Sequence, residues 1–348
     1  MSNEIIITSV QAFLDAIDNL GGLWKPKPAT LFFRGQADYS WELLPSLYRD
    51  LDKSIANSKV PPYAVTRKFM SHEATALHQF QLYAPLFIEK TSQPATPLEW
   101  LILARHYGLY TRLLDLTNSA LVALYFSCDA PDSSDGAVFI LDPEWYNGVF
   151  HLVATRGVIS PFVTSRDVPE GLFNLPFDVD TSKFSIDANQ YVDPQYRHFF
   201  QYPVVIYPGH SDPRIRQQKS TFALFGSNHK ILQGLLDDPD INKEGIIDHI
   251  IAYTNYWIDQ TFPLDQANAI KPELKRVLST TQENLMRNLG LQTRLAKLRV
   301  PSSKKKQIRS QLELCGITRA DLFPGLEGIT SDINERFLNA IRHLSQDQ

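Results

Sequence analysis

The chain has 348 residues, of which 43% are hydrophobic and 21% charged, enough for one large domain or two of ordinary size around a substantial core. Its 34 basic and 38 acidic residues give a net charge of −4. This balance excludes a global basic field that would attract polyanions, so any nucleic-acid contact has to be local.

The composition predicts a cytoplasmic protein without a membrane partner. No stretch is apolar for long enough to span a bilayer, and the first residues include Glu4 and lack the apolar core of a signal peptide. Cys128 and Cys315 lie far apart in segments that read as apolar helix. We therefore expect two buried free thiols in a reducing compartment rather than a disulfide framework.

The N-terminal third predicts two helices and a strand. Residues Thr8 to Leu20 carry apolar side chains at helical spacing, and Gly21-Gly22 is expected to end that helix. The apolar run Thr30–Arg34 predicts a strand. A long helix is expected from Tyr63 to Phe87, ended or kinked near Pro85.

The best-marked helix start is Thr96-Pro97-Leu98-Glu99. A Thr-x-x-Glu pattern with proline at the first helical position forms a capping box, and Gly108 is placed to end the helix that follows. After a short loop, Thr117 or Asn118 is expected to cap an apolar helix that runs to Cys128. A turn at Asp135-Gly136 then leads into a strand over Ala137–Leu141.

The rest of the chain predicts two more strands, at Pro203–Tyr207 and Thr221–Phe225, and a long irregular excursion from Val163 to Pro194. Such an excursion is typical of a lid or a partner surface. From about Asp237 the pattern becomes helical. The helices expected there are Ile246–Tyr256, Pro272–Leu298 and one around Ile333–Leu344.

These elements predict an α+β fold, with a mixed or antiparallel split sheet flanked by helices. Residues 1–236 form the expected core and residues 237–348 a helical C-terminal region packed on it. A ligand cleft is expected between sheet and helices. We predict no metal site, because His72 and His78 are six residues apart and not at the i, i+4 spacing of paired ligands.

Two segments place charged or hydroxyl side chains against apolar runs. Arg34 ends an apolar strand, so it needs an anionic or carbonyl partner, either a ligand or Asp115. Arg112 is a second possible partner of Asp115. His106 and Tyr107 end a helix, where they either stack on an aromatic ring or complement the helix dipole.

These motifs resemble those of the FRG domain family, named for its Phe-Arg-Gly triplet. The resemblance rests on Phe33-Arg34-Gly35-Gln36, on the run from His106 to Thr117 that leads into Ala123–Phe126, on Arg214-Ile215 with Gln218 and Phe222, and on Leu322–Leu326.

The order of these motifs is also similar to that of the Arg-Ser-Glu type of ADP-ribosyltransferase. The resemblance implies that Arg34 holds a phosphate of NAD and that Thr117 is the hydroxyl residue, while Gln218 stands where that superfamily has a glutamate. Because a neutral amide supplies no negative charge, either Asp115 supplies it or the site binds without efficient turnover. The residues expected to bind NAD are Arg34, Gly35, Gln36, His106, Tyr107, Arg112 and Thr117, and the catalytic candidates are Asp115, Gln218 and Thr117.

The function expected from this resemblance is NAD-dependent ADP-ribosyl transfer or NAD cleavage, with NAD as substrate, in an effector of bacterial defence or toxin systems. The acceptor and the oligomeric state stay open. The alternative is a non-catalytic module that senses a nucleotide or recognises a protein, which the neutral Gln218 favours. A third interpretation gives Arg34, Arg112 and Asp115 only a structural role as a buried network.

Overall fold

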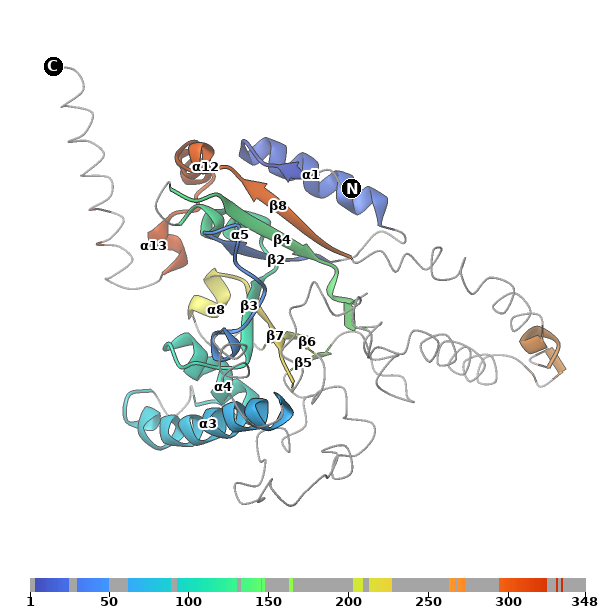
Figure 1. Cartoon of the computed structure of the whole chain (residues 1–348), viewed down its shortest axis with the longest axis vertical. Helices are drawn as coiled ribbons and strands as arrows, with labels where there is room; N and C mark the ends of the chain where they lie inside the picture. The colour runs from blue at the N-terminus through green and yellow to red at the C-terminus, as the bar shows by residue number, and fades with distance from the viewer. Residues whose placement is uncertain are drawn as a thin grey trace.

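The computed structural model is described for part of the chain (Figure 1). The described ranges are 4–24, 30–49, 62–88, 93–129, 133–144, 146–147, 163–164, 203–208, 213–226, 294–323 and a few residues between 263 and 272 and at 330 and 333. Most of the excursion expected over Val163–Pro194 and of the helices expected after residue 237 lies outside them.

The described residues form an eight-stranded mixed sheet of order β1-β8-β4-β2-β3-β7-β6-β5 at the centre of Figure 1. The pairs β1–β8 and β5–β6 are parallel, and all other pairs are antiparallel. The predicted α+β class with a mixed sheet is confirmed. The strands are β1 Ile5–Ile6, β2 Phe32–Gln36, β3 Leu113–Thr117, β4 Gly136–Leu141, β5 Val163–Thr164, β6 Val204–Tyr207, β7 Ser220–Leu224 and β8 Leu295–Val300.

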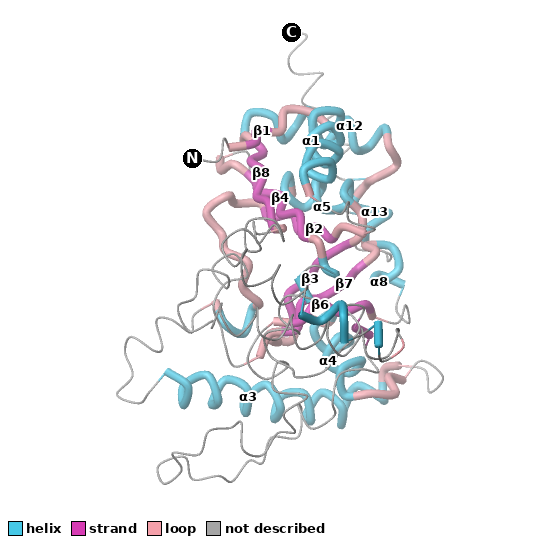
Figure 2. The backbone as a smooth tube through the Cα atoms, turned by 90° about the vertical axis from the view of Figure 1, so that its right-hand side faces the viewer, coloured by secondary structure: helices cyan, strands magenta, loops and turns pink. Residues whose placement is uncertain are grey.

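Figure 2 shows two groups of helices, one around α1, α5 and α12 and the other around α3 and α4. Helices α1, α5 and α12 lie near β8, β4 and β2, whereas α3 and α4 lie near the end formed by β7 and β6. The helices are α1 Val10–Leu23, α3 Pro62–Tyr83, α4 Pro97–His106, α5 Ala120–Cys128, α8 Pro213–Gln217, α12 Ser302–Leu314 and α13 Arg319–Leu322, with short 3₁₀ turns η1 Ser46–Tyr48 and η2 Ala84–Leu86.

Local sequence explains several of these boundaries. The Ser9 hydroxyl accepts from the Ala12 N–H and starts α1, and the Thr96–Glu99 capping box starts α4 as predicted. Helix α3 passes into η2 at Pro85. The prediction that Gly21-Gly22 ends α1 was wrong, because the helix continues to Leu23.

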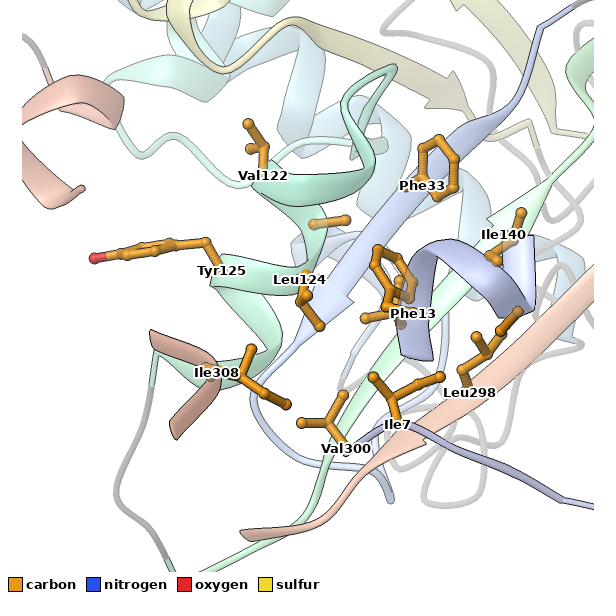
Figure 3. Packing of buried hydrophobic residues seen from close by; sticks show 14 of the residues in the cluster. Ile7, Phe13, Phe33, Val122, Leu124, Tyr125, Ile140, Leu298, Val300 and Ile308 are labelled. Atoms are coloured by element: carbon orange, nitrogen blue, oxygen red, sulfur yellow. The ribbon is translucent and has the colours of Figure 1, made fainter. Parts of the chain in front are cut away.

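One face of the sheet carries the main apolar layer (Figure 3). Phe33 of β2 and Ile140 of β4 meet Phe13 of α1 and Leu124 of α5 there, and Ile308 of α12 closes the layer. Alternate residues of the same strands, including Phe32 and Phe139, face the other side and pack on Leu43 and Tyr48. The sheet is therefore covered on both faces.

Two glycines allow α5 to lie directly on the sheet. A Cβ on Gly35 would meet the Ala123 carbonyl oxygen at 1.8 Å, and one on Gly136 would meet the Ser127 carbonyl oxygen at 2.1 Å. Side chains at these positions would separate helix from strand. Gly35 is thus required by packing, since the side of its Cα that would carry a side chain faces α5.

Strands β3 and β8 depart from the sequence-based expectation. No strand bounds were predicted around Leu113–Thr117, where a short loop was expected to lead to a helix cap at Thr117 or Asn118, but this segment forms β3 and pairs along its whole length with β7, and the residue before α5 is Ser119. The helix expected over Pro272–Leu298 ends in residues that belong to β8, which pairs with β4 and β1. The C-terminal part of the chain thus contributes a strand to the core sheet. Cys128 is buried as predicted, but Cys315 is exposed, so the predicted burial was wrong for that thiol.

Candidate functional site

Strand β2 directs Arg34 toward β3 at the weakest junction of the sheet. The two strands are paired only at Phe33 and Thr117 within the described residues, so they diverge beyond that point. Arg34 spans the gap: its Nη1 donates to the Asp115 carbonyl oxygen at 2.5 Å and lies 3.7 Å from Asp115 Oδ2. The expected Arg34–Asp115 contact is therefore present, mainly through the backbone.

The principal partner of the Asp115 carboxylate is Arg105, which the sequence interpretation missed. Arg105 Nε lies 3.3 Å from Oδ1 and Nη2 lies 2.7 Å from Oδ2, a two-point pairing. Arg105 Nη1 also donates to Ser46 Oγ at 3.3 Å. The available signal was position: Arg105 directly precedes the His106 motif, in the last turn of a helix whose start the capping box fixes.

Charge is unevenly distributed around this carboxylate. Burial lowers the pKa of Arg34 to about 10, opposed by Asp115 and reinforced by the nearby Arg49 and Arg105. Burial alone would raise the pKa of Asp115, but Arg105 and Arg34 outweigh it and hold that pKa below its ordinary value. Asp115 is therefore ionised at neutral pH. We call Arg34, Arg49, Arg105 and Asp115 the arginine cluster, in which cations outnumber the carboxylate.

The arginine cluster keeps unused capacity for a ligand. The Asp115 side chain is 40% exposed. Arg34 Nε is a buried donor that has no hydrogen-bond partner among the described residues. Because a buried donor without an acceptor costs free energy, an anionic oxygen at this position would be stabilising.

Arg112 lies outside the arginine cluster, so the expected Arg112–Asp115 pair was wrong. The Arg112 side chain pairs with Glu73 of α3, and its backbone N–H donates to Glu73 Oε1 at 2.6 Å. Both side chains are only 1% exposed. Arg112 therefore joins β3 to α3 from within the core and presents no surface to NAD, contrary to its predicted role in binding.

Thr117 and Gln218 are brought together, but through backbone contacts. Thr117 Oγ1 donates to the Gln218 carbonyl oxygen at 2.7 Å and accepts from the Ser119 N–H at 3.0 Å. Gln218 Nε2 donates to the Leu322 carbonyl oxygen at 3.0 Å. The Thr117 hydroxyl thus joins the end of β3 to the turn before β7, and the Gln218 amide is directed at α13.

The remaining predicted binding residues have structural contacts. Gln36 Nε2 donates to the Glu42 carbonyl oxygen at 3.1 Å and holds the loop after β2. The His106 and Tyr107 rings lie 5.7 Å apart at the end of α4, and Tyr107 lies 6.3 Å from Phe80 of α3. Tyr107 therefore helps to join the end of α4 to α3.

Two classes of site find no support in the part of the chain that the structure describes. No group of three or more histidine, cysteine, aspartate or glutamate side chains is arranged to hold a metal ion there. Within the same ranges, no helix has the length and apolar character needed to cross a membrane.

The described residues thus form an α+β fold that carries the arginine cluster at one strand junction. Residues 29–136 match the family model of the FRG domain, which confirms the resemblance for the motifs within that range. The match contains the whole arginine cluster, Thr117 and the Arg112–Glu73 pair, whereas Gln218 lies beyond it. No curated protein and no solved structure matches the chain.

Proposed function

We propose that this protein binds an NAD-like nucleotide through the arginine cluster and transfers or releases its ADP-ribosyl group. One observation carries the proposal: Arg34 and Arg105 both pair with a single carboxylate that is 40% exposed, Arg49 adds a further positive charge near Arg34, and Arg34 Nε has no acceptor among the described residues. Guanidinium groups bind phosphate oxygens in a fixed fork geometry. A pyrophosphate is the part of NAD that matches this excess of positive charge.

Asp115 is the group in the cluster suited to the reaction. In NAD cleavage the bond between the ribose and nicotinamide breaks, its electron pair leaves with nicotinamide, and water or another acceptor bonds to the ribose carbon and loses a proton. Positive charge develops on the ribose during this step, and a carboxylate stabilises it. Because the pKa of Asp115 is lowered, the residue carries the required charge at neutral pH.

A specific observation favours a second function, a nucleotide-binding module without turnover. Both oxygens of Asp115 are engaged by Arg105, which reduces the field that the carboxylate offers to the ribose. The neutral Gln218 amide is directed at Leu322. In this case the same cluster senses the nucleotide. The role in bacterial defence or toxin systems stays a prediction for either function.

Both functions are tested by incubating the protein with NAD while measuring nicotinamide release and thermal stabilisation. Arg34→Ala and Arg105→Gln are the test variants, and Arg319→Ala, at an arginine paired with Asp129 elsewhere, is the control. Release that disappears in the test variants alone supports the enzyme. Stabilisation without release supports the binding module, and the absence of both refutes NAD as ligand.

A further inference from the structure

An exposed aromatic residue lies in the loop between α4 and β3. Tyr110 is 70% exposed, and its side chain has no hydrogen bond or ring contact among the described residues. The loop that carries it turns at Gly108, which has a φ of +90°. Its backbone is held where Leu109 N–H donates to the Ala104 carbonyl at 3.0 Å. An exposed ring on a fixed loop is available to a ligand.

The loop is attached to the arginine cluster through one hydroxyl group. Ser46 Oγ accepts from Arg105 Nη1 at 3.3 Å and from the Thr111 N–H at 3.4 Å. Leu47 N–H in turn donates to the Thr111 carbonyl at 3.3 Å. The Ser46 hydroxyl oxygen therefore bridges the Arg105 guanidinium and the peptide N–H that follows Tyr110.

His106 and Tyr107, the two residues that the sequence predicted for ring stacking, contact other aromatic rings of the protein. The Tyr107 ring lies 6.3 Å from Phe80 of α3 and 5.7 Å from the His106 ring, so it contacts other aromatic rings although it is 63% exposed. Tyr110 has no such engagement. In a nucleotide, the sugar separates the base from the phosphates, so the residue that contacts the base has to stand beside the phosphate-binding arginines and not among them.

We propose that Tyr110 stacks on the heteroaromatic ring of the nucleotide whose phosphates bind the arginine cluster. The inference rests on the proposed function and adds the residue that selects a base-containing ligand over a bare polyphosphate. Stacking of a base on an aromatic side chain is sequence-tolerant and contributes substantially to affinity. Tyr110 is thus a specificity-determining residue.

The test compares the affinity for NAD with the affinity for inorganic pyrophosphate, which has no ring, by calorimetry. Tyr110→Ala is expected to weaken NAD binding about tenfold and to leave pyrophosphate binding unchanged. Tyr110→Phe keeps the ring and is expected to bind NAD like the unmodified protein. Tyr83→Ala, at a tyrosine at the end of α3 that is 65% exposed, is the control.

The outcomes separate this inference from the proposed function. If the unmodified protein binds NAD and Tyr110→Ala binds it equally well, the stacking role is refuted while the proposed function stands. An equal loss for NAD and pyrophosphate also refutes it, since the variant has then disturbed the cluster and not the ring contact. If the unmodified protein binds neither ligand, both proposals are refuted together.

Discussion

Gly35→Ala should be among the most destabilising single-methyl additions in this protein. The added Cβ would lie 1.8 Å from the Ala123 carbonyl oxygen and 2.8 Å from the Ser127 nitrogen, whereas ordinary contacts begin at 3.4 Å. These are backbone atoms of α5 and cannot rotate away. The helix has to retreat from β2 by well over an ångström, which opens the apolar layer around Phe33. We expect a loss of about 3 kcal/mol or more in the free energy of unfolding, at the upper end of overpacking costs.

The measurement is urea unfolding followed by tryptophan fluorescence and circular dichroism. Gly22→Ala is the matched control, because this helical glycine has no atom within 4 Å of its added Cβ. Alanine has a higher helix propensity than glycine, so the free energy of unfolding of the control should rise by about 0.5–1 kcal/mol. Equal stabilities for the two variants would refute the close approach of α5 to β2. If Gly35→Ala lowered the free energy of unfolding only slightly, that result would also refute the close approach of α5 to β2.

Three other substitutions test the charged and polar contacts. Glu73→Gln leaves the buried Arg112 without a carboxylate and should cost about 3–5 kcal/mol in urea unfolding; a loss below about 1 kcal/mol would argue against the pair. Asp115→Asn removes a charge that repels phosphate, so pyrophosphate should bind roughly threefold to tenfold more tightly in calorimetry, and weaker binding would contradict the cluster. The lowered pKa of Asp115 contributes stability that is complete above its unfolded pKa, near 4, and is lost as pH falls through the folded value. The original protein should therefore lose more stability than Asp115→Asn on acidification below about pH 4, as melting temperatures at each pH will report. Thr117→Val should cost about 1–2 kcal/mol, since the Gln218 carbonyl and Ser119 N–H lose their partner; an unchanged unfolding midpoint would show that these contacts contribute nothing.

Sequence was sufficient where the determining interactions are local. The capping box at Thr96 and Glu99 predicted the start of α4 because both partners lie within one helical turn. The apolar runs that became β4 and β7 were predicted because every residue in them is compatible with burial on both faces. The helix start and the apolar character of these runs are local properties, although the strands that pair with β4 and β7 lie far away in the chain.

Sequence was insufficient where the partner lies far away in the chain. The run Leu113–Thr117 is short and contains Asp115, and only its pairing with β7 makes it a strand. In β8, alternate apolar residues give the period of a strand, yet Lys297 and Arg299 resemble the exposed face of a helix. The charge partners were equally hidden: Glu73 is one of many polar residues in α3, and nothing local connects it with Arg112.

Strand β8 has a consequence for the order in which the protein folds. β8 lies between β1 and β4. One edge of β4, at residues 136–141, pairs with β2, but its other edge is paired only after residues 295–300 have formed β8. Contacts of such high sequence separation slow folding, because a long loop has to close before they form. During synthesis, β4 leaves the ribosome with one edge open while the next 150 or so residues are still being added, a period in which an unpaired apolar strand favours aggregation. A fragment limited to residues 29–136 never receives β8 and lacks nearly all of β4, so β2 keeps an open edge; expression of the FRG match alone is therefore a poor route to soluble protein.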